Sequence, residues 1–125
     1  MKTKKINLTI TGCLGRMGQQ LIKSASKDKR FKINSLTENK LQRKKILGIL
    51  PKLNNSEAFK KSDVIIDFTI PKCTLEVLNI AAKQKKRVII GTTGFTLKEE
   101  NTIKKISKKI PILKAGNMSL GINLL

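Results

Sequence analysis

Three glycines spaced three residues apart point to chemistry in this chain. Gly12, Gly15 and Gly18 lie between a run of alternating apolar residues and a segment with helical spacing. Glycine lets the backbone turn sharply and approach an anion without an intervening Cβ. The first N–H groups of the following helix lack intrahelical partners and carry partial positive charge. The pattern therefore indicates a loop that cradles a pyrophosphate, although the commoner spacing is G-x-G-x-x-G.

A carboxylate about 20 residues beyond this loop supports that interpretation. An apolar run over residues 31–37 ends at Glu38, where dinucleotide-binding folds place the acid that holds the adenosine ribose hydroxyls. Gly18, one turn into the helix, is then the small residue that lets helix and strand pack closely. From the glycines alone, an ordinary strand–turn–helix remains an open alternative. The ordered combination of turn, helix, second strand and acid favours a dinucleotide site.

Three further segments follow predicted strands and so belong at the same edge of a sheet. They are residues 67–69 (Asp-Phe-Thr), 91–94 (Gly-Thr-Thr-Gly) and 115–119. Ligands of parallel α/β sheets bind outside the carboxyl ends of the strands, so this convergence predicts a binding site there. Asp67 precedes a helix, and we interpret it as a helix cap rather than a catalytic group. Cys13 either approaches the ligand or fills space within the glycine turn.

Alternating strands and helices must position these segments. Apolar or β-branched runs predict strands over residues 6–11, 31–37, 63–69, 87–90 and 110–113. Residues 39–55 are interpreted as a loop, followed by a short helix over residues 57–61. The order predicts an α/β fold, a Rossmann-like doubly wound parallel sheet in a single domain.

The helices of this sheet have clear boundary signals. The first follows Gly15 and places Met17, Leu21 and Ala25 on its inner face. The second begins at Pro71, because proline suits the first helical position. The third follows a capping box formed by Thr96 and Glu99. Pro111 places the last strand at a sheet edge or moves its start to Ile112.

Composition limits the alternatives. The 125 residues carry 27 basic and 8 acidic side chains, for a net charge of +19. Such charge attracts anions, but the lysines are dispersed and the chain has no Trp or Tyr for base stacking. We therefore expect a dinucleotide ligand rather than nucleic acid. Without histidine, the commonest general acid–base group at neutral pH is missing. Two cysteines form no disulfide framework and no metal motif.

Four motifs taken together resemble one enzyme family. They are Gly-Cys-Leu-Gly-Arg-Met-Gly at residues 12–18, Asp-Phe-Thr-Ile-Pro at 67–71, Gly-Thr-Thr-Gly-Phe at 91–95 and Ala-Gly-Asn-Met-Ser-Leu-Gly-Ile-Asn-Leu-Leu at 115–125. The set is similar to the dihydrodipicolinate reductases (4-hydroxy-tetrahydrodipicolinate reductases), enzymes of the diaminopimelate route to lysine. The resemblance runs from Ile6 to Leu125. It implies an NAD(P)H-dependent reductase that transfers hydride to a cyclic dicarboxylate. Because Glu38 would repel the 2′-phosphate of NADPH and Asn39 supplies no guanidinium, we expect NADH to bind at least as tightly as NADPH.

The resemblance also implies roles for particular residues. The loop at residues 12–18 cradles the cofactor, Glu38 lies at the adenosine ribose, and residues 91–93 lie against the nicotinamide half. We predict no catalytic and no metal-binding residue in this chain. The residues predicted to bind cofactor are Gly12, Cys13, Leu14, Gly15, Arg16, Met17, Gly18, Glu38, Phe68, Gly91, Thr92, Thr93, Ala115, Asn117 and Met118.

Parts of the family pattern find no counterpart here. The family's second domain carries a paired-histidine motif with a lysine and a glycine–threonine segment, and neither can be placed. We therefore expect a dinucleotide-binding domain over residues 1–118, residues 119–125 as the start of a connection to a substrate domain, and no activity from this chain alone. Asn39 stands where the family often has Arg, and Gly116 where proline is common.

Other expectations concern the setting of the protein. Without a signal peptide or a long apolar run, the chain is expected to be cytoplasmic and not to bind membranes. The whole enzyme is expected to be a homo-oligomer, formed mainly through the second domain. The alternatives are the cofactor domain of another two-domain NAD(P)-dependent dehydrogenase and a non-catalytic nucleotide-binding module.

Overall fold

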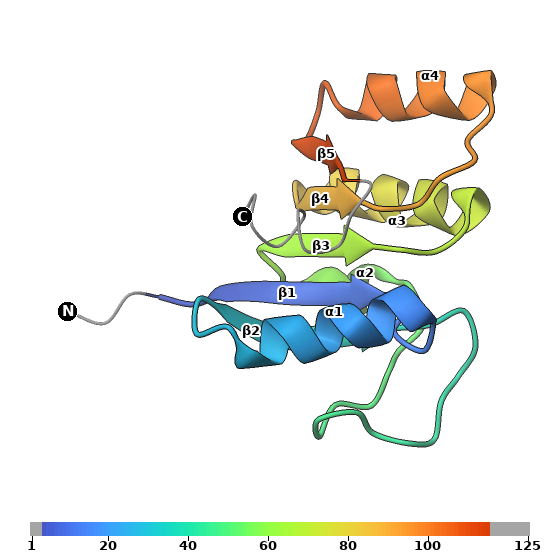
Figure 1. Ribbon diagram of the computed structural model, residues 1–125. Coiled ribbons are helices and arrows are strands. Elements are labelled where there is room, and N and C mark those ends of the chain that lie inside the picture. Colours follow the sequence, from blue (N-terminus) through green and yellow to red (C-terminus); the bar gives the residue numbers. More distant parts are fainter. Residues whose placement is uncertain (1–3, 116–125) are drawn as a thin grey trace.

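The computed structural model describes residues 4–115 and contains one five-stranded parallel sheet (Figure 1). The strand order is β2-β1-β3-β4-β5, which confirms the predicted Rossmann-like α/β fold. The strands are β1 (Ile6–Thr11), β2 (Phe31–Thr37), β3 (Val64–Asp67), β4 (Arg87–Ile90) and β5 (Ile112–Lys114). The helices are α1 (Arg16–Lys27), α2 (Ser56–Phe59), α3 (Pro71–Gln84) and α4 (Leu97–Ile106).

Two apolar clusters lie on opposite faces of the sheet. Alternate residues of a strand point to opposite faces, so Ile66 of β3 packs in the cluster with α1 while Ile65 packs in the cluster with α2, α3 and α4. In Figure 1, α1 accordingly lies in front of β1 and β2, and α3 lies behind the sheet. Burial on both faces explains why the sequence of β3 is continuously apolar.

The helix boundaries follow the signals in the sequence. Pro71 is the first residue of α3, and the capping box of Thr96 and Glu99 is formed in full at the start of α4. β5 begins at Ile112, after Pro111, and lies at the edge of the sheet. These predictions are confirmed. Among the described residues, no helix is long and apolar enough to cross a membrane.

The prediction for the inner face of α1 is wrong at its first turn. Met17 is 37% exposed, whereas Gly18, Leu21, Ile22 and Ala25 are buried. The buried stripe therefore begins one residue later than the apolar spacing indicated. The reason is that the bare backbone of Gly18 packs against the preceding turn.

Candidate cofactor site

The carboxyl ends of the strands lie in register at one edge of the sheet. Thr11 pairs with Thr37 of β2 and with Asp67 of β3, and Asp67 pairs with Ile90 of β4. The loops that follow these residues are therefore adjacent. The shared edge brings together residues 12–18, Glu38, Phe68 and residues 91–93, as the sequence predicted.

Backbone contacts at its glycines hold the turn between β1 and α1. Gly12 has a φ of 63°, in the left-handed region, and a Cβ there would lie 2.7 Å from the Phe68 carbonyl oxygen. A Cβ on Gly18 would lie 2.1 Å from the Gly12 carbonyl oxygen. Real side chains do not occupy such positions. The first and third glycines therefore allow β1, α1 and the β3–α3 connection to approach one another.

The amino terminus of α1 is open. Its N-cap residue is Gly15, which has no side chain to accept a hydrogen bond, and its first turn contains no acidic residue. Within residues 4–115, no acceptor bonds the N–H groups of Arg16, Met17 or Gly18. Together with the positive end of the helix dipole, these N–H groups suit a phosphate group.

Glu38 lies directly beside this turn. The Leu14 N–H donates to Glu38 Oε2 (3.0 Å), and the Asn39 N–H donates to Oε1 (3.0 Å). The two bonds fix the carboxylate at the mouth of a cavity of about 280 Å³. The cavity is lined by Gly12, Gly15, Glu38, Asn39, Asn54, Phe68, Thr69, Ile70 and Cys73. Gly12, Gly15, Glu38 and Phe68 are predicted site residues, and Thr69 belongs to a segment that the sequence placed at this edge. No motif in the sequence indicated Asn54 or Cys73 as a site residue.

The loop after β4 forms the other side of the edge. A Cβ on Gly91 would overlap the Phe68 ring, at 1.8 Å from its nearest atom, so this glycine lets ring and loop touch. Thr92 and Thr93 line a second cavity of about 300 Å³ together with Ala115. The Ala115 N–H donates to the Ile90 carbonyl (2.8 Å), which places it beside this loop. Asn117 and Met118 lie outside the described residues.

Cys13 does not face this edge. Its side chain is fully buried in the cluster between α1 and the sheet. Burial, and secondarily the Glu38 carboxylate, raises the pKa of the Cys13 thiol to about 11. Of the two readings of Cys13, the structure supports the space-filling one, and the Cys13 N–H donates to the Thr37 carbonyl (3.2 Å). Leu14, in contrast, is 41% exposed beside the turn.

Asp67 does not cap α3, so that prediction is wrong. The N-cap residue is Ile70, and the Asp67 carboxylate instead accepts hydrogen bonds from the hydroxyl groups of Thr11, Thr69, Thr74 and Thr92. Sequence reasoning overlooked this cluster. Its signal was the recurrence of threonine at the carboxyl ends of neighbouring strands.

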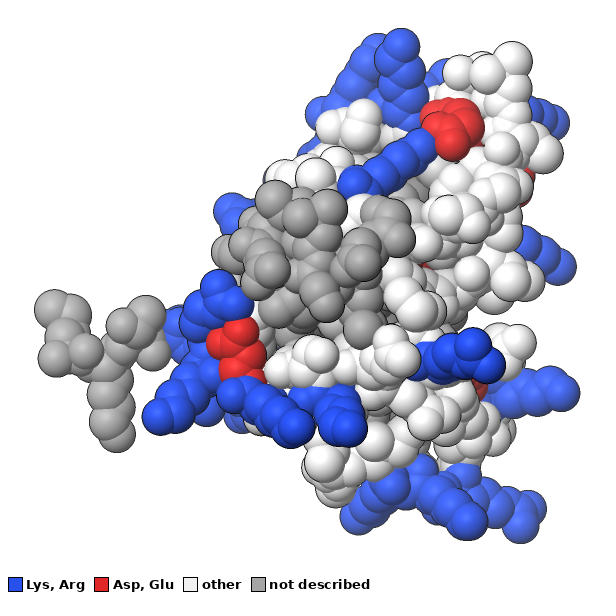
Figure 2. Space-filling view, viewed as in Figure 1, with Lys and Arg blue, Asp and Glu red and all other residues white. Residues whose placement is uncertain are grey.

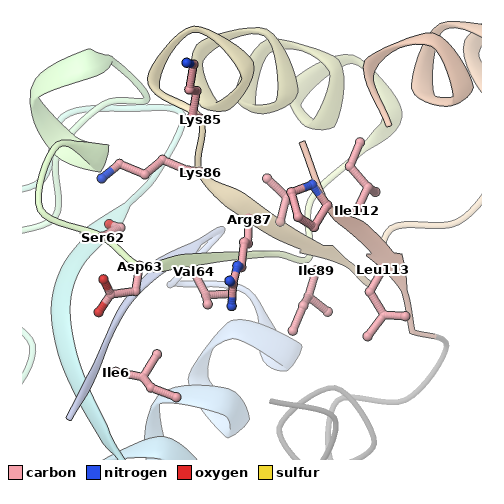
Figure 3. A pocket seen from close by; sticks show the side chains of 12 residues that line it. Ile6, Ser62, Asp63, Val64, Lys85, Lys86, Arg87, Ile89, Ile112 and Leu113 are labelled. Carbon is pink, nitrogen blue, oxygen red and sulfur yellow. The ribbon is translucent and has the colours of Figure 1, made fainter. Parts of the chain in front are cut away.

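A larger cavity lies at the opposite edge. It measures about 750 Å³ and is bordered by the amino-terminal ends of β1, β3, β4 and β5. Figure 3 shows the charged side chains of Asp63, Lys86 and Arg87 and the apolar side chains of Ile6, Ile89 and Leu113 that line it. Because ligands of parallel sheets bind at the carboxyl ends of strands, we do not assign the cofactor to it.

Basic side chains are spread over the face drawn in Figure 2. Lys and Arg appear over several elements, and Asp and Glu are few. This distribution attracts anions without selecting one location. Selection must therefore come from the local geometry of the glycine turn and Glu38.

The parallel sheet of order β2-β1-β3-β4-β5 and the glycine turn beside Glu38 are those of a Rossmann-like nucleotide-binding domain. The profile described as "Dihydrodipicolinate reductase, N-terminus" matches residues 6–118. The chain belongs to this family of reductase amino-terminal domains.

Individual relatives agree with the family assignment. The chain is 69% identical to the 4-hydroxy-tetrahydrodipicolinate reductase of Pelagibacter ubique (strain HTCC1062), over 98% of this chain and 47% of that protein. It is 40% identical to the enzyme of the same name from Buchnera aphidicola subsp. Baizongia pistaciae, over 100% of this chain and 50% of that protein. The chain thus spans about half the length of the curated relatives it matches.

A solved structure matches the fold. The dipicolinate-bound dihydrodipicolinate reductase from Paenisporosarcina sp. TG-14 superposes with a TM-score of 0.76 at 23% identity, over 97% of this chain and 51% of that one. At this identity the likeness carries the fold alone.

Proposed function

We propose that these residues form the cofactor-binding half of a 4-hydroxy-tetrahydrodipicolinate reductase, in the diaminopimelate route to lysine. The observation that carries the proposal is the open amino terminus of α1 beside Glu38, in a chain that belongs to this family. The substrate of the whole protein is then an unsaturated cyclic dicarboxylate. We further propose a cytoplasmic homo-oligomer that associates mainly through a second domain.

The residues fit a nicotinamide dinucleotide along the edge of the sheet. The N–H groups of Arg16 and Met17 would hold the pyrophosphate, and Glu38 would accept hydrogen bonds from the adenosine ribose. Phe68 and residues 91–93 would border the nicotinamide. The cofactor supplies the hydride, while this half of the protein binds and orients it. With no histidine among the 125 residues, we assign proton donation to a group outside them.

Because we assign cofactor binding to this chain and proton donation to a group outside it, we predict that the chain binds NADH but does not reduce the substrate. The purified 125-residue chain is expected to enhance NADH fluorescence on titration, because the residues proposed to hold the dinucleotide all lie within residues 12–118. It is expected to show no reductase activity with the cyclic substrate. Measurable turnover by this chain would contradict the assignment of proton donation, and absence of NADH binding by a folded chain would contradict the cofactor assignment.

The choice between NADH and NADPH depends on Glu38. A 2′-phosphate carries roughly −1.5 to −2 charge, as other phosphomonoesters do, and would meet a carboxylate fixed by two backbone N–H groups. Asn39 supplies no guanidinium to offset the repulsion. We therefore propose that NADH binds at least as tightly as NADPH.

Salt dependence tests this preference. Arg16, Lys40 and the surrounding basic surface attract the extra phosphate, and their effect is screened over a Debye length of about 8 Å at physiological salt. NADPH is expected to gain affinity relative to NADH as salt is lowered. Titration of both cofactors at low and physiological salt measures the ratio. A clear NADPH preference at physiological salt would show that a basic side chain grips the phosphate and that Glu38 turns away from the ribose.

A further inference from the structure

A fully buried carboxylate lies beneath the proposed cofactor cleft. Asp67 is 0% exposed, at the end of β3, and no salt bridge among residues 4–115 includes it. Its partners are four threonine hydroxyls that come from four different places: the end of β1, the β3–α3 connection, the first turn of α3 and the loop after β4. Buried polar groups of this kind are costly unless satisfied, and here each oxygen accepts at least two hydrogen bonds.

Thr92 connects this carboxylate to the loop that borders the cleft. Its hydroxyl donates to Asp67 Oδ2 (3.0 Å) and accepts from the Thr69 N–H (3.0 Å). The neighbouring Gly91 N–H donates to the Asp67 carbonyl oxygen (2.8 Å). Both the side chain and the backbone of Asp67 therefore hold residues 91–92, and Thr92, itself buried, presents its hydroxyl to Asp67 rather than to the cleft.

The same short segment also fixes the opposite side of the cleft. The Phe68 carbonyl oxygen lies 2.7 Å from the position of a Gly12 Cβ, and the Phe68 ring overlaps the position of a Gly91 Cβ. Displacement of residues 67–69 would thus shift both the pyrophosphate turn and the loop after β4. The hydrogen bonds to Asp67 connect this segment to both sides of the cleft.

We propose that Asp67 is a positioning residue that acts through Thr92 to hold residues 91–93 against Phe68, in the place where the nicotinamide half of the cofactor binds. The inference rests on the proposed dinucleotide function. Asp67 has no contact with the cofactor, and the chemistry it serves is orientation. Loss of the Thr92 hydroxyl should therefore weaken recognition of nicotinamide more than recognition of the rest of the molecule.

The experiment compares NADH with ADP-ribose, which keeps the adenosine and pyrophosphate but lacks nicotinamide. Thr92→Val removes the hydroxyl with little change of shape, and Thr92→Ser retains it. Thr11→Val is the matched control, because it removes a different donor to the same carboxylate without touching residues 91–93. Affinities are measured by NADH fluorescence and by ADP-ribose competition, after thermal melting has shown that each variant is folded.

In Thr92→Val, affinity for NADH is expected to fall about tenfold relative to affinity for ADP-ribose, the loss that corresponds to one positioning hydrogen bond. Thr92→Ser should keep the parental ratio, and so should Thr11→Val, since any shift of the pyrophosphate turn affects both ligands alike. Asp67→Asn combined with Thr92→Val should change the ratio no more than Thr92→Val does.

An unchanged ratio in folded Thr92→Val would overturn the inference, as would an equal change in Thr11→Val. If Thr92→Val lowers only the melting temperature, the hydrogen bonds between the threonines and Asp67 serve stability alone, and the inference is overturned. Failure of the parent chain to bind either ligand would instead overturn the proposed function, so the two failures are distinguishable.

Discussion

Gly18→Ala is expected to destabilise the protein, although alanine is the better helix former. Relative to glycine, alanine in a helix contributes about 0.5–1 kcal/mol of stability. In this position its Cβ would lie 2.1 Å from the Gly12 carbonyl oxygen and 2.9 Å from the Cys13 Cα. Both neighbours are backbone atoms, so the turn must move as a whole. Overpacking of this kind costs about 1–3 kcal/mol. Backbone contacts this short place the cost near the upper end of that range, so after the gain in helix propensity we expect a net loss near 2 kcal/mol.

Thermal and urea unfolding followed by circular dichroism measure this loss. For a domain of this size it corresponds to a fall in melting temperature of roughly 5–10 °C. Gly15→Ala is the matched control, because a Cβ there would meet only the same Gly12 oxygen, at 3.3 Å. Because alanine is a poorer N-cap residue than glycine, it should lower stability by no more than about 1 kcal/mol. A rise in melting temperature for Gly18→Ala would show that helix propensity prevails and that α1 does not pack so closely on the turn.

Gly15→Val is expected to have the opposite profile, with binding lost and the fold retained. Gly15 adopts φ −69° and ψ 163°, an extended conformation open to valine, and its side chain would project into the cavity beside Glu38. The branched side chain would then occupy the space proposed for phosphate oxygens. Affinity for NADH should fall more than tenfold, because the clash adds to a helix-dipole contribution of about 0.3–1 kcal/mol.

Stability should respond much less to this substitution. Valine is a poorer N-cap residue than glycine, and the difference amounts to no more than about 1 kcal/mol. The Gly15→Ala variant should bind with intermediate affinity, since it carries a smaller side chain in the same direction. If folded Gly15→Val binds NADH as well as the parent, the phosphate lies elsewhere and the role proposed for this turn is wrong.

The sequence predicted the sheet well because its signals are local. The β-branched runs, Pro71 and the capping box of Thr96 and Glu99 act within a few residues of their own positions. The convergence of the glycine turn, Glu38 and residues 91–93 on one edge then followed from the parallel topology, because carboxyl ends of parallel strands share an edge.

The errors arose where distant contacts decide the outcome. Asp67 was interpreted as a cap because the adjacent helix was visible in the sequence, whereas its partner Thr11 lies 56 residues away. Met17 fits the helical spacing of the buried stripe as well as its neighbours do, and only the packing of Gly18 on Gly12 turns it outward.

The strand order also governs when the protein can fold during its synthesis. β1 is made early, but in the sheet it lies between β2 and β3, and its pairing with β3 closes only once Asp67 has left the ribosome. Pairing of β1 with β3 closes a long loop, which costs conformational entropy of the chain. The contacts between the two strands offset this cost only after the loop has closed. Until then β1 and β2 form a two-stranded pair covered on one face by α1, and the edge of β1 that β3 later occupies is unpaired. Folding of the nascent chain therefore depends on the synthesis of β3, which ends at Asp67. The sheet can form cooperatively only after β3 has paired with β1.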